Sequence, residues 1–294
     1  MKNVESSEIA LYRKYRPHTF KDVIGQDHII SVLQHSIAQG TISHAYLFGG
    51  SRGTGKTSIA RIFARDIGTA TQDVYEIDAA SNRGIDDVRE IRESVHTLPF
   101  ESKYKVYIVD EVHMLTKEAF NALLKTLEEP PPYVVFILAT TEIEKLPETV
   151  VSRCQTFTFK KPNQHMLAQV VSVVSKKEGF SIDASSSDLI ALLGDGSFRD
   201  TLGVLQKVMS VSEDKKITID EVERITGAPR APLVQDVVYG IVYKDKEKSI
   251  LAVHALVESG IDMTVCMKLI LEKVRFLLLL RVAPALSKKI ETSI

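Results

Sequence analysis

The sequence predicts an α/β domain built on a parallel sheet, followed by a region that consists of helices. Three short runs are almost entirely apolar, which is typical of strands buried on both faces of a parallel sheet, namely residues 45–48, 106–109 and 134–139. Helical patterns alternate with these runs, as they do in crossover connections. After Pro162 the strand-like runs stop and helical patterns follow one another. We therefore expect three domains, an α/β domain over residues 1–161 and helical domains over residues 162–227 and 228–294.

The elements between these runs follow from the spacing of their apolar residues. Residues 56–67 follow a glycine-rich turn and fit a helix, and residues 74–77 fit a further strand. A stripe that repeats every three or four residues and stops at a proline predicts a second helix, with one face formed by Ile85, Val88, Ile91, Val95 and Leu98. A third helical face precedes three prolines and comprises Phe120, Leu123, Leu124 and Leu127.

Composition sets limits on the kind of protein. Of the 294 residues, 44% are hydrophobic and 26% are charged, as in ordinary globular proteins, and the net charge of −1 gives no overall basic field for nucleic acid. Cys154 and Cys266 are far apart, so we expect no zinc site and no disulfide framework, and a reducing cytoplasm is the expected location. The apolar run at residues 276–280 is too short to span a bilayer and is expected to be a buried helix, without membrane association.

The strongest local motif is GSRGTGKT at residues 50–57, which fits GxxxxGK[ST] between a strand and a helix. Its glycines let backbone N–H groups turn toward a phosphate, and the helix N-terminus adds a favourable dipole. We expect Lys56 to reach the β- and γ-phosphates and Thr57 to bind Mg²⁺. The alternative is a glycine-rich turn that binds nothing. The residues expected to hold ATP are Gly50, Ser51, Arg52, Gly53, Thr54, Gly55, Lys56, Thr57 and Ser58.

A second motif places two carboxylates, Asp110 and Glu111, directly after a buried strand. Carboxylates at the carboxyl end of a parallel strand lie beside the nucleotide crevice. We expect Asp110 to complete the Mg²⁺ shell and Glu111 to orient and deprotonate the attacking water. Alone, the pair could be two solvated loop carboxylates. Beside the glycine-rich loop, it favours an ATP hydrolase over a protein that only binds ATP.

Longer strings carry a more specific resemblance than these two motifs. They are YRKYRPHTFKDVIGQ (12–26), HAYLFGGSRGTGKTSIAR (44–61), EIDAASNRGIDDVR (76–89), KVYIVDEVHML (105–115), FNALLKTLEEPP (120–131), FILATTEIEKLP (136–147), SRC (152–154) and GSFRDTL (196–202). In these strings the chain resembles the gamma/tau subunits of the bacterial DNA polymerase III clamp loader, which are AAA+ ATPases. The resemblance implies an AAA+ nucleotide-binding domain, a helical lid and a helical collar. It also implies an ATPase subunit of a DNA-directed DNA polymerase holoenzyme, without a polymerase active site of its own.

The resemblance assigns roles to residues that spacing alone does not single out. Thr141 matches the sensor 1 position, where a hydroxyl bonds the γ-phosphate or the attacking water. Arg199 matches sensor 2, an arginine that the lid presents to the phosphates; without the resemblance it would be a surface cation paired with Asp195 or Asp200. The segment that packs near adenine and ribose is matched by Tyr12, Arg16 and Pro17, which otherwise fit a solvated basic cluster.

Arg153 matches the arginine finger of the SRC motif. The resemblance implies that it reaches the γ-phosphate held by a neighbouring subunit and stabilises transition-state charge there. The alternative is a surface arginine that pairs with a local carboxylate such as Glu148. Cys154 is expected to be a small packing residue rather than a reactive thiol.

The resemblance also implies partners, with two departures from the family pattern. The partners are the other clamp-loader subunits in a ring, a sliding clamp and primer–template DNA, whose phosphate backbone we expect Arg83, Arg89 and Lys125 to contact in a salt-dependent way. The four-cysteine zinc module of typical members is absent between residues 63 and 78, so ATP and Mg²⁺ are expected without zinc. The chain stops at Ile294, part-way through the expected collar.

Two other functions fit parts of the sequence. A Holliday-junction branch-migration motor is a related AAA+ protein, but it should carry a winged-helix module, and residues 227–294 indicate plain helices. An ATP-binding scaffold that does not hydrolyse ATP is disfavoured by the intact Lys56, Asp110, Glu111 and Thr141. An ATP-driven clamp-loader motor subunit is the interpretation that uses all the motifs.

Overall fold

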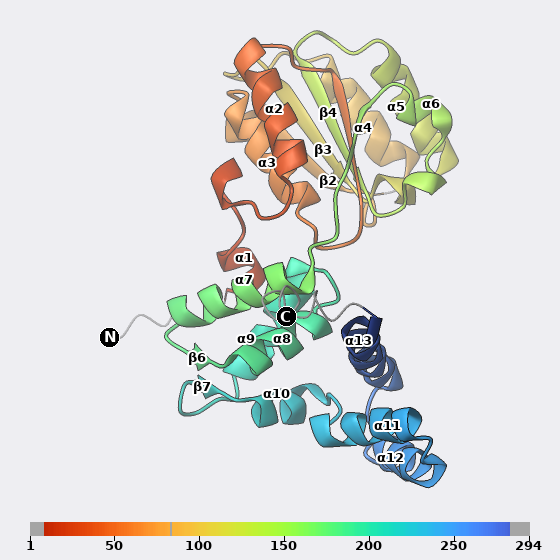
Figure 1. Ribbon diagram of the computed structural model, residues 1–294. Coiled ribbons are helices and arrows are strands. Elements are labelled where there is room, and N and C mark those ends of the chain that lie inside the picture. Colours follow the sequence, from red (N-terminus) through yellow and green to blue (C-terminus); the bar gives the residue numbers. More distant parts are fainter. Residues whose placement is uncertain (1–8, 83, 283–294) are drawn as a thin grey trace. The chain divides into compact units, whose positions relative to one another are not determined.

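The computed structural model describes residues 9–82 and 84–282, which fall into two compact units (Figure 1). The α/β unit is Arg16–Pro162, and the helical unit comprises the described parts of residues 1–15 and 163–294. Residues 9–15, which the sequence placed in the α/β domain, therefore belong to the helical unit. The limit between lid and collar near residue 227 stays a prediction.

The α/β unit is built on a five-stranded sheet in the order β2-β3-β4-β1-β5, and every neighbouring pair is parallel. The strands are β1 (Ala45–Gly49), β2 (Val74–Asp78), β3 (Lys105–Asp110), β4 (Val134–Thr140) and β5 (Gln155–Thr158). This confirms the predicted parallel α/β sheet. The first strand, β1, lies between β4 and β5, so the loop that follows it opens beside the ends of two other strands.

Each central strand is buried on both faces because its alternate side chains enter two separate cores. In β4, Phe136 and Leu138 pack into one core, and Val135 and Ile137 pack into the other. This two-sided burial explains why the strands read as continuous apolar runs rather than as alternating ones.

Helices cover both faces of the sheet, as Figure 1 shows. On one face, the core contains apolar residues of α2 (Asp27–Gln39) and α3 (Lys56–Asp66). On the other face, it contains residues of α4 (Ile85–Val95) and α5 (Lys117–Glu128). Short helical segments complete the unit, namely η1 (Phe20–Asp22), η2 (Thr71–Asp73), η3 (Val112–Met114), η4 (Ile143–Lys145) and α6 (Glu148–Val151).

The end of α4 differs from the prediction. The sequence placed Leu98 on the buried stripe of this helix, but α4 ends at Val95 and Leu98 is 75% exposed. The buried Lys105 explains the stop, because its Nζ donates to the carbonyl oxygen of Ser94 at 2.6 Å and to Thr97 Oγ1 at 2.7 Å. The ammonium group satisfies a carbonyl that a further helical turn would have used.

The helical unit contains α1 (Leu11–Lys14) and the elements after Pro162. These are α7 (Gln164–Lys177), β6 (Ser181–Ile182), α8 (Ala184–Leu193), α9 (Phe198–Met209), β7 (Lys216–Ile217), α10 (Ile219–Thr226), α11 (Ala231–Tyr243), α12 (Lys246–Glu258) and α13 (Met263–Val282). The two-residue pair β6–β7 is a strand pair where the sequence indicated helices alone.

Two contacts explain why α1 belongs to this unit. Leu11 is buried in a core with Leu202 and Leu205 of α9, and its backbone N–H donates to Gln206 Oε1 at 2.9 Å. The ammonium group of Lys14 pairs with Glu178 at 2.7 Å. An apolar anchor and an ion pair therefore fix the N-terminal helix on elements that come much later in the sequence.

The last described helix departs from its predicted burial. Residues 276–280 are helical, but Leu277 and Leu278 are 41% and 55% exposed. Within the described part of the chain, no helix is long and apolar enough to cross a membrane.

Candidate nucleotide site

The glycine-rich loop lies between β1 and α3, at the carboxyl edge of the sheet where ligands of open α/β folds bind. Gly50 has φ 148° and Gly55, directly before α3, has φ 102°, and both values favour glycine. A Cβ on Gly50 would lie 2.7 Å from the carbonyl oxygen of Phe159, so a larger residue would displace backbone. The loop is therefore held close to the chain that leaves β5.

Lys56 is the first residue of α3, and its side chain folds back over the loop. The residue is only 6% exposed, and its Nζ donates to the carbonyl oxygens of Gly50 at 2.7 Å and Ser51 at 2.9 Å. Thr54 Oγ1 also donates to the Ser51 carbonyl, at 2.9 Å, which closes the turn. An ammonium group thus lies at the N-terminus of a helix, where the helix dipole also favours an anion.

Thr57 and Asp110 come from different elements and meet at the same place. The hydroxyl Oγ1 of Thr57, in the first turn of α3, donates to Oδ2 of Asp110, at the end of β3, over 2.7 Å. Mg²⁺ prefers hard oxygen ligands at about 2.1 Å in octahedral geometry, so two neighbouring ligands lie roughly 3 Å apart. The two oxygens, 2.7 Å apart, therefore need to move apart only slightly to fit the Mg²⁺ shell expected from the sequence. No group of three or more His, Cys, Asp and Glu among the described residues could hold a metal ion.

Glu111 and Thr141 are also brought together. Oε2 of Glu111 accepts hydrogen bonds from the Thr141 backbone N–H at 3.2 Å and from Thr141 Oγ1 at 3.0 Å. Glu111 has φ 49° and ψ 44°, a left-handed conformation that is unfavourable for a residue with a Cβ. The two residues expected to contact the attacking water thus bond each other beside the loop.

His113 completes this group of side chains, and the sequence analysis did not assign it a role. Its side chain is 6% exposed, Nδ1 lies 2.9 Å from Thr140 Oγ1 and 3.6 Å from Glu111 Oε2, and Nε2 lies 3.4 Å from Glu142 Oε1. The signal was present, because the histidine stands three residues after Asp110 in VDEVHML. The turn after β4 that would bring Thr140 and Glu142 to its ring could not be inferred from that spacing.

Arg153 lies at the amino end of the strands, opposite the carboxyl end where the glycine-rich loop lies. It lies two residues before the start of β5, which runs parallel to β1, whereas the glycine-rich loop follows the carboxyl end of β1. Its guanidinium donates to the Thr149 carbonyl and to Glu128 Oε1, both at 2.7 Å, so the local acidic partner is Glu128 rather than the expected Glu148. Its neighbour Cys154 packs against the apolar core, and burial raises the pKa of this thiol to about 11, in keeping with a packing role.

The residues expected to contact adenine and ribose, and the lid arginine expected to contact the phosphates, are divided between the two units. Tyr12 and Arg199 belong to the helical unit, where the Arg199 guanidinium lies 5.6 Å from the centre of the Tyr12 ring. Arg16 and Pro17 belong to the α/β unit. Of the two suggested acidic partners of Arg199, Asp195 forms an ion pair with Lys268 at 3.2 Å. The structure thus brings two of these four residues together, and their contact with nucleotide stays a prediction.

Comparison with known proteins places this site in a family. A family model described as DNA polymerase III, delta subunit matches residues 25–83 and 68–163. The DNA polymerase III subunit gamma of Buchnera aphidicola subsp. Baizongia pistaciae (strain Bp) is 33% identical over 297 residues, which cover 94% of this chain and 80% of that protein. The chain belongs to the DNA polymerase III gamma/tau family. This confirms the resemblance that the motifs indicated.

Longer gamma/tau relatives match the chain as closely. The DNA polymerase III subunit tau of Bacillus subtilis (strain 168) is 39% identical over 303 residues, covering 96% of this chain and 54% of that protein. The gamma/tau subunit of Mycoplasma pneumoniae is 44% identical over 234 residues, covering 73% of this chain and 34% of that protein. The chain therefore spans about half the length of the first of these relatives and less of the second.

Solved structures confirm the fold class of this gamma/tau chain. Thermotoga maritima RuvB, a Holliday junction branch migration motor, has a TM-score of 0.61 and 18% identity, covering 88% of this chain and 91% of that one. Its T158V variant has a TM-score of 0.62 and the same identity, covering 86% and 88%. At this identity the likeness shows the AAA+ fold alone, with a parallel sheet followed by helices.

Two of the three cations expected at DNA lie on helices that cover the same face of the gamma/tau chain's sheet. Arg89 on α4 and Lys125 on α5 are both exposed, and their helices contact each other. Arg83 is outside the described residues. Two adjacent helices thus present cations to solvent, which is the arrangement that a phosphate backbone contact needs.

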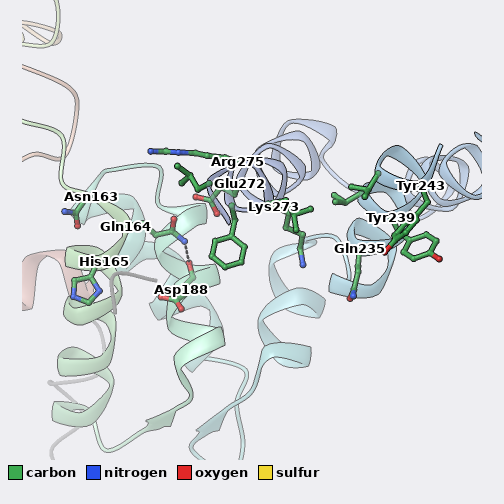
Figure 2. Close-up of a pocket in the computed structure, with 15 residues that line it drawn as sticks. Asn163, Gln164, His165, Asp188, Gln235, Tyr239, Tyr243, Glu272, Lys273 and Arg275 are labelled. Atoms are coloured by element: carbon green, nitrogen blue, oxygen red, sulfur yellow. Dashed lines mark hydrogen bonds between the residues drawn. The ribbon is translucent and has the colours of Figure 1, made fainter. Parts of the chain in front are cut away.

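A separate cavity of about 970 Å³ lies in the helical unit of the gamma/tau chain (Figure 2). Figure 2 shows it between the start of α7, Asp188 of α8, and side chains of α11 and α13. Gln164 Nε2 donates to the Asp188 carbonyl oxygen at 3.2 Å, and burial raises the pKa of the Asp188 carboxyl. Tyr239 and Tyr243 of α11 contact each other at a ring distance of 4.3 Å. None of the residues expected to bind nucleotide lines this cavity.

Proposed function

We propose that this chain is an ATP-hydrolysing motor subunit of a clamp loader. The observation that carries the proposal is the meeting of Thr57, Asp110, Glu111 and Thr141 beside Lys56, at the carboxyl edge of a parallel sheet. A site that only bound ATP would need the cationic loop and the Mg²⁺ ligands. It would not need a carboxylate beside the position of the γ-phosphate.

The residues divide the chemistry among themselves. Backbone N–H groups of residues 50–57 and the Lys56 ammonium bind the phosphates, while Thr57 and Asp110 supply oxygens to Mg²⁺. Bound Mg²⁺ neutralises phosphate charge and orients the β- and γ-phosphates. Glu111 accepts a proton from the attacking water, and the hydroxyl of Thr141 orients the water or the γ-phosphate.

Family membership supports the proposed partners. We place the chain in a ring with other clamp-loader subunits, where Arg153 serves the ATP site of a neighbour. The assembly opens a sliding clamp and closes it on primer–template DNA, gripped through its phosphates by cations such as Arg89 and Lys125. This role puts the protein in the cytoplasm, at the replication fork.

Steady-state ATPase assays test the proposal. The chain is reconstituted with the remaining clamp-loader subunits of its source, and hydrolysis is measured alone, with clamp, with primed DNA and with both. We expect clamp and primed DNA together to stimulate hydrolysis about tenfold or more, and Glu111→Gln serves as the control for contaminating ATPases.

Each other result identifies another function. ATP binding without hydrolysis in the complete assembly would indicate the scaffold. Stimulation by four-way junctions, but not by clamp with primed DNA, would indicate a branch-migration motor. Either outcome contradicts the clamp-loader proposal.

A further inference from the structure

We propose that His113 is a positioning residue for the Glu111 carboxylate, which it joins to the turn formed by Thr140, Thr141 and Glu142. This inference rests on the proposed ATP hydrolysis and names a residue through which that site is controlled. His113 does not contact the phosphates or the water in the proposed mechanism. Its effect is on where the base lies.

The ring of His113 is enclosed by polar atoms from two segments. Nδ1 shares a hydrogen bond of 2.9 Å with Thr140 Oγ1, which also accepts from the Glu142 N–H at 3.0 Å. The other nitrogen, Nε2, faces Glu142 Oε1 at 3.4 Å. With a side chain only 6% exposed, the ring has few other positions available, so it is a fixed point next to the base.

The charged groups around the ring are also defined. Glu111 Oε2 is 3.6 Å from Nδ1 on one side, and the Glu142 carboxylate faces Nε2 on the other. Glu142, directly before η4, forms an ion pair at 2.5 Å with Lys145, the last residue of η4. A shift of this turn therefore moves the ring, and the ring lies against Glu111.

Glu111 needs such a neighbour because its present hydrogen bonds compete with its proposed task. The Thr141 hydroxyl has one proton, which it now donates to Glu111 Oε2 at 3.0 Å. If Thr141 donates that proton to the γ-phosphate, Glu111 loses this bond. The carboxylate is then oriented by the Thr141 N–H and by the packing of His113.

The backbone of Glu111 makes this orientation sensitive. Its left-handed conformation is unfavourable for a residue with a Cβ, so the surrounding contacts must hold it in place. His113 belongs to η3, which begins directly after Glu111. The ring can thus hold both the side chain and the turn that carries it.

The first test compares His113→Ala with wild type in the reconstituted assembly. We expect kcat to fall on the order of tenfold, because a misplaced base loses part of its effect, while KM and the affinity for ATP stay within about twofold. His254→Ala is the matched control, since that histidine is 69% exposed on α12, and it should leave kcat unchanged. An unchanged kcat in His113→Ala, or an equal loss of kcat and ATP affinity, overturns the proposal.

Conservative variants separate positioning from simple packing. The amide of His113→Asn can replace Nδ1 toward Thr140 and Glu111, and the amide of His113→Gln can replace Nε2 toward Glu142. We expect Asn to restore most of the lost kcat and Gln to restore less. If Leu, which fills the space without a polar atom, restores kcat as well as Asn, the ring only packs and the proposal fails.

A second measurement does not depend on hydrolysis. Hydrogen exchange of the Thr141 amide is followed in the whole chain without nucleotide, because this N–H donates to Glu111 Oε2. We expect exchange to be roughly threefold faster or more in His113→Ala, with unchanged exchange in the β4 interior. Equal exchange rates at Thr141 contradict the positioning role even if the assembly proves not to hydrolyse ATP, an outcome that concerns the proposed function alone.

Discussion

Glu111 is the residue on which the proposed chemistry depends most. It directly follows Asp110, the proposed Mg²⁺ ligand, whose Oδ1 accepts a hydrogen bond from the Glu111 backbone N–H at 3.0 Å. Two adjacent carboxylates thus have different partners, one the hydroxyl of Thr57 and the other the hydroxyl of Thr141. In the proposed mechanism, this division lets Asp110 bind the metal while Glu111 remains available as a base.

Glu111→Gln should separate binding from hydrolysis. We expect ATP affinity to stay within about twofold of wild type and turnover to slow by about 100-fold or more, roughly the contribution of a general base. Lys56→Ala is the contrasting variant, since loss of the phosphate countercharge should abolish tight ATP binding. Equilibrium titration with a fluorescent ATP analogue and single-turnover hydrolysis give both quantities. Retained tight binding in Lys56→Ala, or normal turnover in Glu111→Gln, would contradict these roles.

Much of the site could be predicted at the scale of residues because its parts are contiguous in sequence. The loop from Gly50 to Thr57 is read as one string, and Asp110 and Glu111 end a strand that is visible from its apolar run. The hydrogen bond between Glu111 and Thr141 joins residues 30 positions apart, and His113 depends on the same turn. Such contacts follow from the order of strands in the sheet, which local patterns do not encode.

At the scale of elements, a buried polar network sets where α4 ends and β3 begins. Asp73 is buried, and its carboxylate accepts from the backbone N–H groups of Phe100, Glu101 and Ser102 at 2.6–3.1 Å. Burial lowers the pKa of Lys105, and the Asp73 charge opposes that shift. The two side chains together hold the loop between α4 and β3.

Asp73→Asn should destabilise the protein, and the effect should depend on pH. Burial alone would raise the pKa of Asp73, but its hydrogen bonds from three backbone N–H groups outweigh this, and the pKa is lowered. The carboxylate therefore stabilises the fold above its unfolded pKa of about 3.8, and this contribution disappears as pH falls through the lower folded value. We expect a loss of about 1–3 kcal/mol at pH 7 from the weakened bonds.

Urea unfolding between pH 7 and pH 3 measures this effect. The gap between Asp73→Asn and wild type should narrow as the pH drops below about 4, because the wild-type carboxylate becomes protonated. Asp66→Asn is the control, since Asp66 is exposed and pairs with its neighbour Arg65. A gap that stays constant over this range would show that the charge of Asp73 does not contribute.

The same elements show what the sequence could predict of the fold. The strands β1, β3 and β4 were visible because burial on both faces leaves them almost entirely apolar. The strand β5 was not predicted, because its sequence QTFT is mostly polar and exposed. The end of α4 could not be predicted, because the ammonium group that caps it belongs to Lys105, which follows Pro99 in the sequence. The pair β6–β7 was missed because two residues are too few to show a period.

At the scale of the whole molecule, Arg153 lies far from the glycine-rich loop of the same chain. They lie at opposite ends of the parallel strands, separated by the length of β1, whose five residues span about 16 Å. The proposed phosphate partner of Arg153 therefore belongs to another subunit. Its bonds to Glu128 and Thr149 hold it at the surface, where a neighbour can meet it.

Arg153→Ala should reduce hydrolysis only in the assembly. We expect unchanged ATP affinity in the isolated chain and a fall of about 100-fold or more in the assembled complex, because the lost guanidinium acts on a neighbour's transition state. Glu128→Gln, which removes the local partner and keeps the arginine, should retain most of the activity. Equal loss of hydrolysis in the isolated chain and in the assembly would rule out a role between subunits.

The packing of α1 has a consequence for how the protein is made. Leu11 is synthesised well before its partner Gln206, which lies 195 residues later in the chain. At 5–20 residues per second, the ribosome needs roughly 10–40 s to supply that partner. The α/β unit, Arg16–Pro162, lies between Leu11 and Gln206 in the sequence, so it can leave the ribosome and fold before Gln206 is made. During synthesis, α1 therefore lacks its packing partners until the helical unit has been made. We expect a protease present during synthesis to cleave the chain at α1 more readily than in the completed protein.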